Sequence, residues 1–304
     1  MGPPGSSPRI LRRDEVTSTQ DEALRLLAEG ARHPFAVAAR HQSRGRGRLG
    51  RAFASPAGAS LALTVVHRTA LAPDRRGWFP QVAGLSALAA LDRVLGDAFG
   101  GEGGPGLKWP NDLHTGDGRK LGGILVEARG TDLVLLGVGL NLRGPVVDPD
   151  GAPVPGAAWL LGEDGLLGEG APVPGGADLP VESLRERLET ALAEALGVEL
   201  ARLESAGGDA VSAGIHGRYT MTCLTLGCDV RIDPLGETGA GGTRPRSVHG
   251  TAREIDACGR LVVDLAGGGR TAVDIGDVRH LRPGGPVRSD IQEAMDIEQE
   301  EHGT

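Results

Sequence analysis

The sequence predicts an α+β fold followed by a small all-β domain, and three features of the apolar pattern support this prediction. Segments 80–99 and 181–203 carry apolar residues at helical spacing. Segments 121–128 and 133–142 are apolar runs of strand length, separated by a short polar stretch. From residue 221 onward only short strand patterns occur, at close spacing. A chain of 304 residues is long enough for two domains with a buried core.

The first expected helix begins at Ser18 or Thr19, whose hydroxyl groups suit an N-cap, and it ends at Gly30. Residues 1–9 are rich in Pro and Gly, and we expect them to form a disordered tail. A short apolar strand is expected at 36–40, after the helix. The ordered fold therefore begins too early in the chain to leave room for an N-terminal helix-turn-helix.

The centre of the first domain contains a strand, a helix and a hairpin. Residues 60–67 are rich in Leu and Val and predict a strand. The helix over 80–99 is expected to end at Gly100. The two apolar strands 121–128 and 133–142 are joined by Arg-Gly-Thr at 129–131, which favours a hairpin turn.

The last part of the chain divides into an insertion, a helix and the β domain. We expect a first domain over 10–220, in which residues 144–179 form an irregular insertion dense in Gly, Pro and Asp, with a short ordered element at 158–161. An amphipathic helix is predicted over 181–203. A β domain over 221–284, either barrel or sandwich, and an acidic tail over 285–304 complete the chain. The expected strands of the β domain are 228–233, 251–256, 260–265 and 271–281, with a Gly-rich hairpin loop at 237–245.

Composition excludes several classes of protein. The formal net charge of −8 opposes non-specific binding of nucleic acid, so no DNA partner is expected. No apolar run approaches the ~20 residues of a membrane-spanning helix, and no signal-peptide pattern begins the chain. The three cysteines do not have the spacing of a zinc site and fit a reducing compartment. We therefore expect a cytoplasmic protein.

Lysine and asparagine are scarce, and their positions point to a site. Of 32 basic residues only Lys108 and Lys120 are lysines, and Asn111 and Asn141 are the only asparagines. Where arginine is the default cation, a retained lysine indicates a role for a compact ammonium group that a guanidinium does not fill. Chance survival is the alternative, but all four residues lie within positions 108–141.

An Arg/Gly segment, Gly-Arg-Gly-Arg-Leu-Gly-Arg at 45–51, has the composition of an anion-binding loop. Its glycines let the backbone approach a ligand, and guanidinium groups pair with phosphate oxygens. The segment matches a dinucleotide-binding fingerprint in its letters only, because a strand and not a helix follows it. An RNA-binding interpretation is opposed by an aromatic content of 3%. A solvated surface loop is the remaining alternative.

Three further motifs combine glycines with polar residues. Lys-Trp-Pro-Asn-Asp at 108–112 places Asn and Asp in a turn after a short strand. Gly122 and Gly123, next to Lys120, lie inside an expected strand, where glycine is unfavourable unless a ligand or another backbone comes close. Gly137 and Gly139 alternate in the next strand and leave room for a flat ligand. The alternatives are a simple turn, a β-bulge and tight helix packing.

These four motifs, in this order, resemble the biotin protein ligase family over residues from about 10 to 142. The most specific part is Lys-Trp-Pro-Asn-Asp followed by Arg-Lys-Leu-Gly-Gly-Ile-Leu-Val-Glu at 119–127. The resemblance implies a mixed sheet flanked by helices, related to class II aminoacyl-tRNA synthetases, with a C-terminal SH3-like β-barrel. It also implies activation of biotin by ATP and Mg²⁺ to biotinyl-5′-AMP, followed by transfer to a lysine of a biotin carboxyl carrier protein or domain.

The resemblance also assigns site residues. The implied catalytic residues are Lys120, Arg48 and Asp112, with Asp112 also a candidate Mg²⁺ ligand. The implied biotin-binding residues are Ser18, Thr19, Gln20, Gln42, Arg46, Gly47, Arg48, Lys120, Gly122, Gly123, Gly137 and Gly139. The implied ATP-binding residues are Arg46, Arg48, Arg51, Lys108, Asn111, Asn141 and Arg253. Two positions depart from the family, since Gln20 replaces an Asn and Phe53 replaces a Trp.

Three other functions remain open at the level of sequence. A lipoate or octanoate ligase or transferase has the same fold and would need a longer apolar slot. A biotin-binding protein without catalytic activity is the second, and an RNA-binding protein is the third. The sequence is compatible with a monomer or a homodimer.

Overall fold

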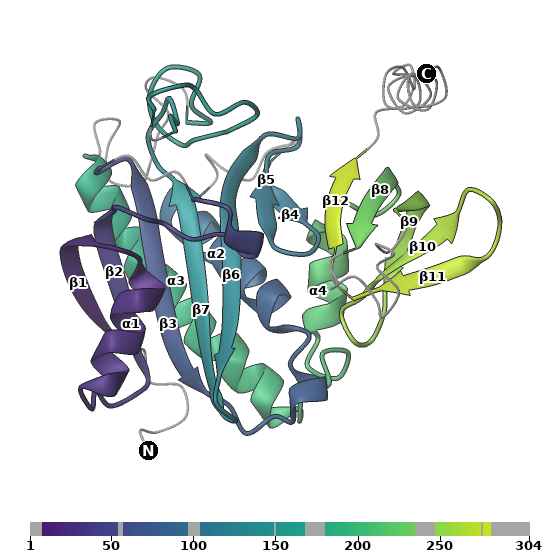
Figure 1. Ribbon diagram of the computed structural model, residues 1–304, viewed down its shortest axis with the longest axis horizontal. Helices are drawn as coiled ribbons and strands as arrows, with labels where there is room; N and C mark the ends of the chain where they lie inside the picture. Colours follow the sequence, from purple (N-terminus) through teal and green to yellow (C-terminus); the bar gives the residue numbers. More distant parts are fainter. Residues whose placement is uncertain are drawn as a thin grey trace, which may run out of the picture.

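A seven-stranded mixed sheet forms the larger part of the protein (Figure 1). The computed structural model describes residues 8–53, 57–96, 104–148, 150–167, 180–234, 247–274 and 276–280. The strand order is β1-β2-β3-β7-β6-β5-β4, in which β1 runs parallel to β2 and every other neighbouring pair is antiparallel. The strands are β1 (Arg9–Val16), β2 (Phe35–Gln42), β3 (Ser60–Arg68), β4 (Gly106–Lys108), β5 (Asp112–His114), β6 (Lys120–Arg129) and β7 (Leu133–Asn141). The expected mixed sheet flanked by helices is confirmed.

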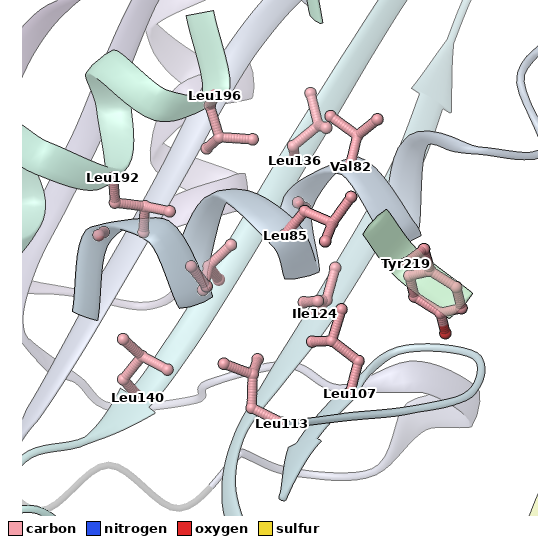
Figure 2. Packing of buried hydrophobic residues seen from close by; sticks show 14 of the residues in the cluster. Val82, Leu85, Leu107, Leu113, Ile124, Leu136, Leu140, Leu192, Leu196 and Tyr219 are labelled. Atoms are coloured by element: carbon pink, nitrogen blue, oxygen red, sulfur yellow. The ribbon is translucent and has the colours of Figure 1, made fainter. Parts of the chain in front are cut away.

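Helices cover the two faces of this sheet unequally. On one face, α2 (Phe79–Leu95) and α3 (Val181–Ser205) pack on the sheet and on each other. Figure 2 shows Val82 and Leu85 of α2 near Leu136 of β7, with Leu196 of α3 close by. None of the helices in the described ranges is both long and apolar enough to cross a membrane.

The opposite face carries the short helix α1 (Thr19–Ala28). Ser18 is its N-cap and accepts a hydrogen bond from the backbone N–H of Asp21 at 3.2 Å, which confirms the predicted start. Helix α1 packs on β2, β3 and β7 over a small apolar cluster that includes Ala23 and Val37. Because α1 is only ten residues long, it leaves part of this face of the sheet uncovered.

The C-terminal part is a five-stranded antiparallel sheet of order β11-β10-β9-β8-β12. Its strands are β8 (Asp229–Pro234), β9 (Val248–Ile255), β10 (Leu261–Leu265), β11 (Arg270–Val273) and β12 (Gly276–His280). Helix α4 (Ile215–Thr222) leads into it. The indoles of Trp78 and Trp109 donate hydrogen bonds to the carbonyls of Ala257 and Gly259, at 2.8 and 3.0 Å. The two sheets are therefore joined by buried contacts.

Several expected boundaries are wrong. Strand β1 begins at Arg9, within the segment expected to be a tail. Helix α2 ends at Leu95 and not at residue 99, because Gly96 adopts a φ of 59°. The single strand expected at 271–281 is two strands, because β11 pairs with β10 whereas β12 pairs with β8.

Other expectations fall on residues for which no structure is described. The Gly-rich loop at 237–245, the acidic tail at 285–304 and residues 168–179 of the insertion lie outside the described ranges. The first part of the insertion is described, and its backbone bridges Ala157 to Lys120 and Leu161 to Arg143. It therefore extends the sheet at the end where β6 begins and β7 finishes.

Candidate active site

A cavity of about 150 Å³ lies on the face of the sheet that α1 leaves uncovered. A wider cavity of about 860 Å³ adjoins it and shares lining residues of the Arg/Gly segment; Val147 and Asp148 of the insertion also line this second cavity. Most of the residues predicted from the sequence line the cavity. They are Ser18, Thr19, Gln20, Gln42, Arg46, Gly47, Arg48, Arg51, Asn111, Asp112, Lys120, Gly123, Gly137 and Gly139.

The floor of the cavity is made of glycines that two side chains approach closely. A Cβ atom on Gly139 would lie 2.5 Å from Cζ of Phe53, and one on Gly137 would lie 2.7 Å from Nε2 of Gln20. Both distances are shorter than ordinary Cβ contacts, so a side chain at either position would displace Phe53 or Gln20 and narrow the slot. The result is a narrow slot in which the ring of Phe53 lies next to Gly139 and the amide of Gln20 lies next to Gly137.

One end of the slot is a network of hydroxyl and amide groups. The backbone N–H and the hydroxyl of Thr19 donate to Oε1 of Gln42, at 2.8 and 3.1 Å. The hydroxyl of Thr64 on β3 donates to the hydroxyl of Thr19 at 2.8 Å. All three side chains are buried, so their polar groups are fixed before a ligand arrives. Such an end suits a small polar head group.

The other end carries a partly buried ion pair. Nζ of Lys120, on β6, lies 2.8 Å from Oδ1 of Asp112, on β5, and Nε2 of His114 lies 3.9 Å from Oδ2. Burial by itself raises the pKa of Asp112, but the neighbouring imidazole of His114 and the ammonium of Lys120 outweigh it. The net pKa of Asp112 lies below its usual range, so this carboxylate is ionised at neutral pH.

The Arg/Gly segment lies over the slot. Nη1 of Arg48 donates to Oδ1 of Asn111 at 2.8 Å, and Nδ2 of Asn111 donates to the carbonyl of Ile124 at 2.9 Å. Nη2 of Arg46 lies 2.9 Å from a carboxylate oxygen of Glu127. Arg46, Arg48 and Lys120 therefore surround one cavity, as the sequence predicts.

Comparison with known proteins identifies the family. The model of the biotin/lipoate A/B protein ligase family matches residues 11–141. A biotin–[acetyl-CoA-carboxylase] ligase of Mycobacterium tuberculosis is 35% identical over 274 residues, which cover 88% of this chain and 87% of that protein. The chain belongs to the biotin protein ligase family. A ligase of the same name from Paracoccus denitrificans is 42% identical over 149 residues, covering 46% of this chain and 56% of that protein.

The fold agrees with this membership. A solved structure of a biotin protein ligase from Aquifex aeolicus, in complex with biotin and ATP, matches with a TM-score of 0.63 and 21% identity. The match covers 90% of this chain and 99% of that one. It supports a shared architecture that includes both sheets.

Four residues expected in the site of this biotin protein ligase family member do not line the cavity. A Cβ on Gly122 would lie 2.4 Å from the carbonyl oxygen of Gly139, so this glycine serves strand packing and not the slot. Arg253 lies on β9 with its side chain 65% exposed, 3.9 Å from Asp264. Lys108 ends β4 and does not line the cavity either.

The fourth residue, Asn141, is buried at the end of β7. Its Nδ2 donates to the carbonyls of Ala158 and Lys120, at 2.9 and 3.3 Å. The N–H of Ala158 also donates to the carbonyl of Lys120 at 2.8 Å. Asn141 and the insertion therefore fix the backbone that carries the Lys120 ammonium.

Three residues at the site were not predicted from the sequence, namely Thr64, His114 and Glu127. The alternation of side chains along a strand offered a signal for Glu127, because it shares a face of β6 with Gly123. Thr64 offered a signal of its own, since it is a polar residue within the apolar centre of β3. His114 offered none, because β5 has only three residues and no strand was predicted there that would place His114 on the same face as Asp112.

Proposed function

We propose that this protein is an ATP-dependent biotin protein ligase. It activates biotin to biotinyl-5′-AMP with release of pyrophosphate and transfers the biotinyl group to a lysine of a carrier protein. The observation that carries this proposal is one cavity that joins a polar end at Thr19 and Gln42, a glycine floor, and the cations Lys120 and Arg48. This combination suits a small heterocycle with a carboxylate tail beside a nucleotide.

In the first step, the biotin carboxylate attacks the α-phosphorus of ATP, and the bond to pyrophosphate breaks. Both reactants are anions, so the site must offset their mutual repulsion. The guanidinium of Arg48 contacts Asn111, the ammonium of Lys120 contacts Asp112, and both cations line the cavity and are proposed to do this. The Arg/Gly segment covers the product and excludes water from the mixed anhydride.

In the second step, the amine of the carrier lysine attacks the acyl carbon, and AMP leaves. Asp112 is ionised and has a lowered pKa, which makes it a weak base. We propose that it orients the neutral amine of the carrier lysine by accepting a hydrogen bond, and that the proton lost from the nitrogen on amide formation passes to solvent. The polar end at Thr19 and Gln42 holds the biotin ring during both steps.

The residues of the cavity fit a Mg²⁺ ion that arrives with ATP. Asp112 is the one carboxylate among the described residues that line the cavity, and Mg²⁺ is commonly held by one or two carboxylates together with substrate phosphates. Among the described residues, no group of three or more His, Cys, Asp or Glu side chains is placed to hold an ion alone. When bound, the ion would neutralise phosphate charge.

Finer features of the family are part of this proposal. The five-stranded antiparallel sheet supports the SH3-like assignment of the β domain. The change from α4 to β8 supports a domain boundary near residue 220. A carrier protein with an exposed lysine is the proposed partner.

The decisive experiment measures pyrophosphate release from ATP with and without biotin, followed by transfer to a purified biotin carboxyl carrier domain. We expect release only with biotin, and labelling of one carrier lysine. Release with lipoate or octanoate and not with biotin would favour the other branch of the matched family. Calorimetric binding of biotin without any pyrophosphate release would indicate a non-catalytic binding protein.

A further inference from the structure

We propose that Trp109 and Gln81 are positioning residues, which fix the turn that follows Trp109 in the candidate active site. Both donate a hydrogen bond to the same backbone carbonyl, that of Gly259 in the turn between β9 and β10. The turn after Trp109 carries Asn111 and Asp112, which contact the two cations at the reactive end of the cavity. The expected effect on the reaction rests on the proposed function, whereas the structural effect is measured without any substrate.

Trp109 is bound to the C-terminal part of the chain at two points. Its indole Nε1 donates to the carbonyl of Gly259 at 3.0 Å, and its backbone N–H donates to Oγ1 of Thr225, before β8, at 3.0 Å. The residue is 1% exposed. A buried donor that lost its acceptor would cost free energy, so the indole keeps one orientation relative to Gly259. The backbone that continues toward Asn111 therefore starts from a fixed point.

The acceptor lies in a turn that is itself braced by hydrogen bonds. Oδ1 of Asp256 accepts from the backbone N–H groups of Cys258 and Arg260, at 2.9 and 3.0 Å. The N–H of Gly259 donates to the backbone carbonyl of Asp256 at 3.0 Å, and its φ of 84° lies in the region that favours glycine. The turn itself thus holds the carbonyl of Gly259 in place for the two donors.

Gln81, on α2, is the second donor to this carbonyl. It is 3% exposed, and its Nε2 donates to the carbonyl of Gly259 at 3.2 Å. Its Oε1 is buried and has no hydrogen-bond partner among the described residues. A buried amide oxygen without a partner is unfavourable, and an apolar side chain of similar size would avoid this cost. The hydrogen bond to Gly259 accounts for a glutamine at this position.

The turn carries the constraint to the reacting groups. The N–H of Ile124 on β6 donates to the carbonyl of Asn111 at 2.8 Å, and Nδ2 of Asn111 donates back to the carbonyl of Ile124 at 2.9 Å. Oδ1 of Asn111 accepts from Arg48, and the next residue, Asp112, contacts the ammonium of Lys120. A displacement of about 1 Å in a positioning group can lower a rate by about 10²-fold. A looser turn should therefore slow the reaction.

Trp78 offers a matched comparison within the same interface. It is also 1% exposed, and its Nε1 donates to the carbonyl of Ala257, in the same β9–β10 turn, at 2.8 Å. It is the N-cap residue of α2, and no residue of α2, which is described throughout, lines the cavity. Loss of this hydrogen bond should loosen the interface without moving Asn111.

The first test compares Trp109→Phe with Trp78→Phe in ligand-free protein. Each substitution removes one indole N–H and leaves a smaller ring, so both should lower Tm by a similar amount. Hydrogen exchange of the Ile124 amide, which donates to Asn111, should become about fivefold faster in Trp109→Phe than in the wild type and in Trp78→Phe. An Ile124 amide that exchanges at the same rate in both variants overturns the proposal.

The second test measures biotin-dependent pyrophosphate release. Trp109→Phe should lower kcat about tenfold, with a biotin Kd, measured by calorimetry without ATP, within about twofold of the wild type. The Kd is preserved because the polar end at Thr19 and Gln42 lies on α1 and β2, away from the turn. Trp78→Phe should change neither value. A purely structural role would affect both variants alike, and that result overturns the proposal.

Gln81→Met is a second variant that keeps the size of the side chain and removes the other donor to Gly259. It should act in the same direction, with kcat about threefold lower. If Trp109→Phe does not fold, wild-type kcat and wild-type exchange of the Ile124 amide in Gln81→Met overturn the proposal. Wild-type protein without biotin-dependent pyrophosphate release would refute the proposed function, and the exchange rate would still decide whether Trp109 fixes the turn.

Discussion

At the scale of single residues, the site depends on where each cation is placed. Lys120 is held at its backbone by Asn141 and Ala158, and at its ammonium by Asp112. A compact ammonium fits this position, whereas a guanidinium fork is wider and needs planar partners. The geometry at position 120 therefore explains why a lysine is kept there in a sequence in which arginine is the usual cation.

We expect Lys120→Gln to lower the rate of biotin-dependent pyrophosphate release by about 10²–10³-fold, the usual loss when one electrostatic contact to a transition state is removed. Lys120→Arg keeps the charge and should recover only part of the rate, because the larger group does not fit beside Asp112. Both variants are assayed at saturating biotin and ATP. A Lys120→Gln variant with wild-type turnover would refute the role of the ammonium.

The substitution Arg48→Gly should remove a positive charge from the cavity and also loosen the segment at 45–51 that lies over it. It removes the hydrogen bond to Asn111 and adds a flexible residue to the loop. The adenylate should then escape and label lysines of bystander proteins, which a biotin blot of a mixture with serum albumin detects. Because the chain has only two lysines, it should itself be labelled poorly. Wild-type levels of bystander labelling would argue against the covering role.

At the scale of elements, the β6–β7 hairpin separates two kinds of glycine. Gly122 and Gly123 are neighbours in β6, so side chains at these two positions would point to opposite faces of the sheet. A side chain on Gly122 would press on the carbonyl of Gly139, whereas one on Gly139 would press on the ring of Phe53. Backbone atoms in a sheet move aside much less readily than the end of a side chain does when an added methyl group contacts them.

We therefore expect Gly122→Ala to lower the free energy of unfolding by about 1–3 kcal/mol, the usual cost of overpacking, as measured by urea denaturation. Gly139→Ala should leave the stability nearly unchanged, because the ring of Phe53 moves aside. It should instead weaken biotin binding about tenfold in calorimetry, since the added methyl group narrows the slot. The reverse pattern would show that Gly122 faces the ligand.

Elements differed in how well the sequence predicted them. The helices α1 and α3 and the hairpin strands carry long, regular apolar patterns, and their positions were predicted to within a few residues. Strand β1 was missed because it is an edge strand with charged residues, few of which are buried. Strand β5 has only three residues, which is too short for a period to be seen.

At the scale of the whole molecule, the β domain stabilises the end of the site that holds Lys108–Asp112. The backbone N–H of Trp109 donates to Oγ1 of Thr225 at 3.0 Å, and Nε2 of His280, at the end of β12, lies 3.2 Å from the same oxygen. Burial, together with the charges of Lys108 and His114, lowers the pKa of His280 from 6.5 to about 4. This histidine is therefore neutral in the folded protein at neutral pH.

The protein should become less stable as the pH falls, because of His280. Its pKa is lower in the folded state than in the unfolded chain, so its contribution is complete above pH 6.5 and is lost as the pH falls from 6.5 toward 4. We expect His280→Gln to reduce the loss of Tm between pH 7 and pH 5. Differential scanning calorimetry at the two pH values measures this, and equal losses in both proteins would contradict it.

The sequence by itself determined the chemistry of the protein and its family. Its decisive motifs are continuous runs of residues at 45–51, 108–112 and 119–123, so that their identity does not depend on how the chain folds. Only the tertiary structure decided that Gly122 faces away from the slot, that Asn141 holds the backbone of Lys120, and that Arg46 pairs with Glu127 across 81 positions. These contacts depend on which strands become neighbours and which face each side chain takes. That choice is made by packing of the whole chain and is not encoded in any short segment.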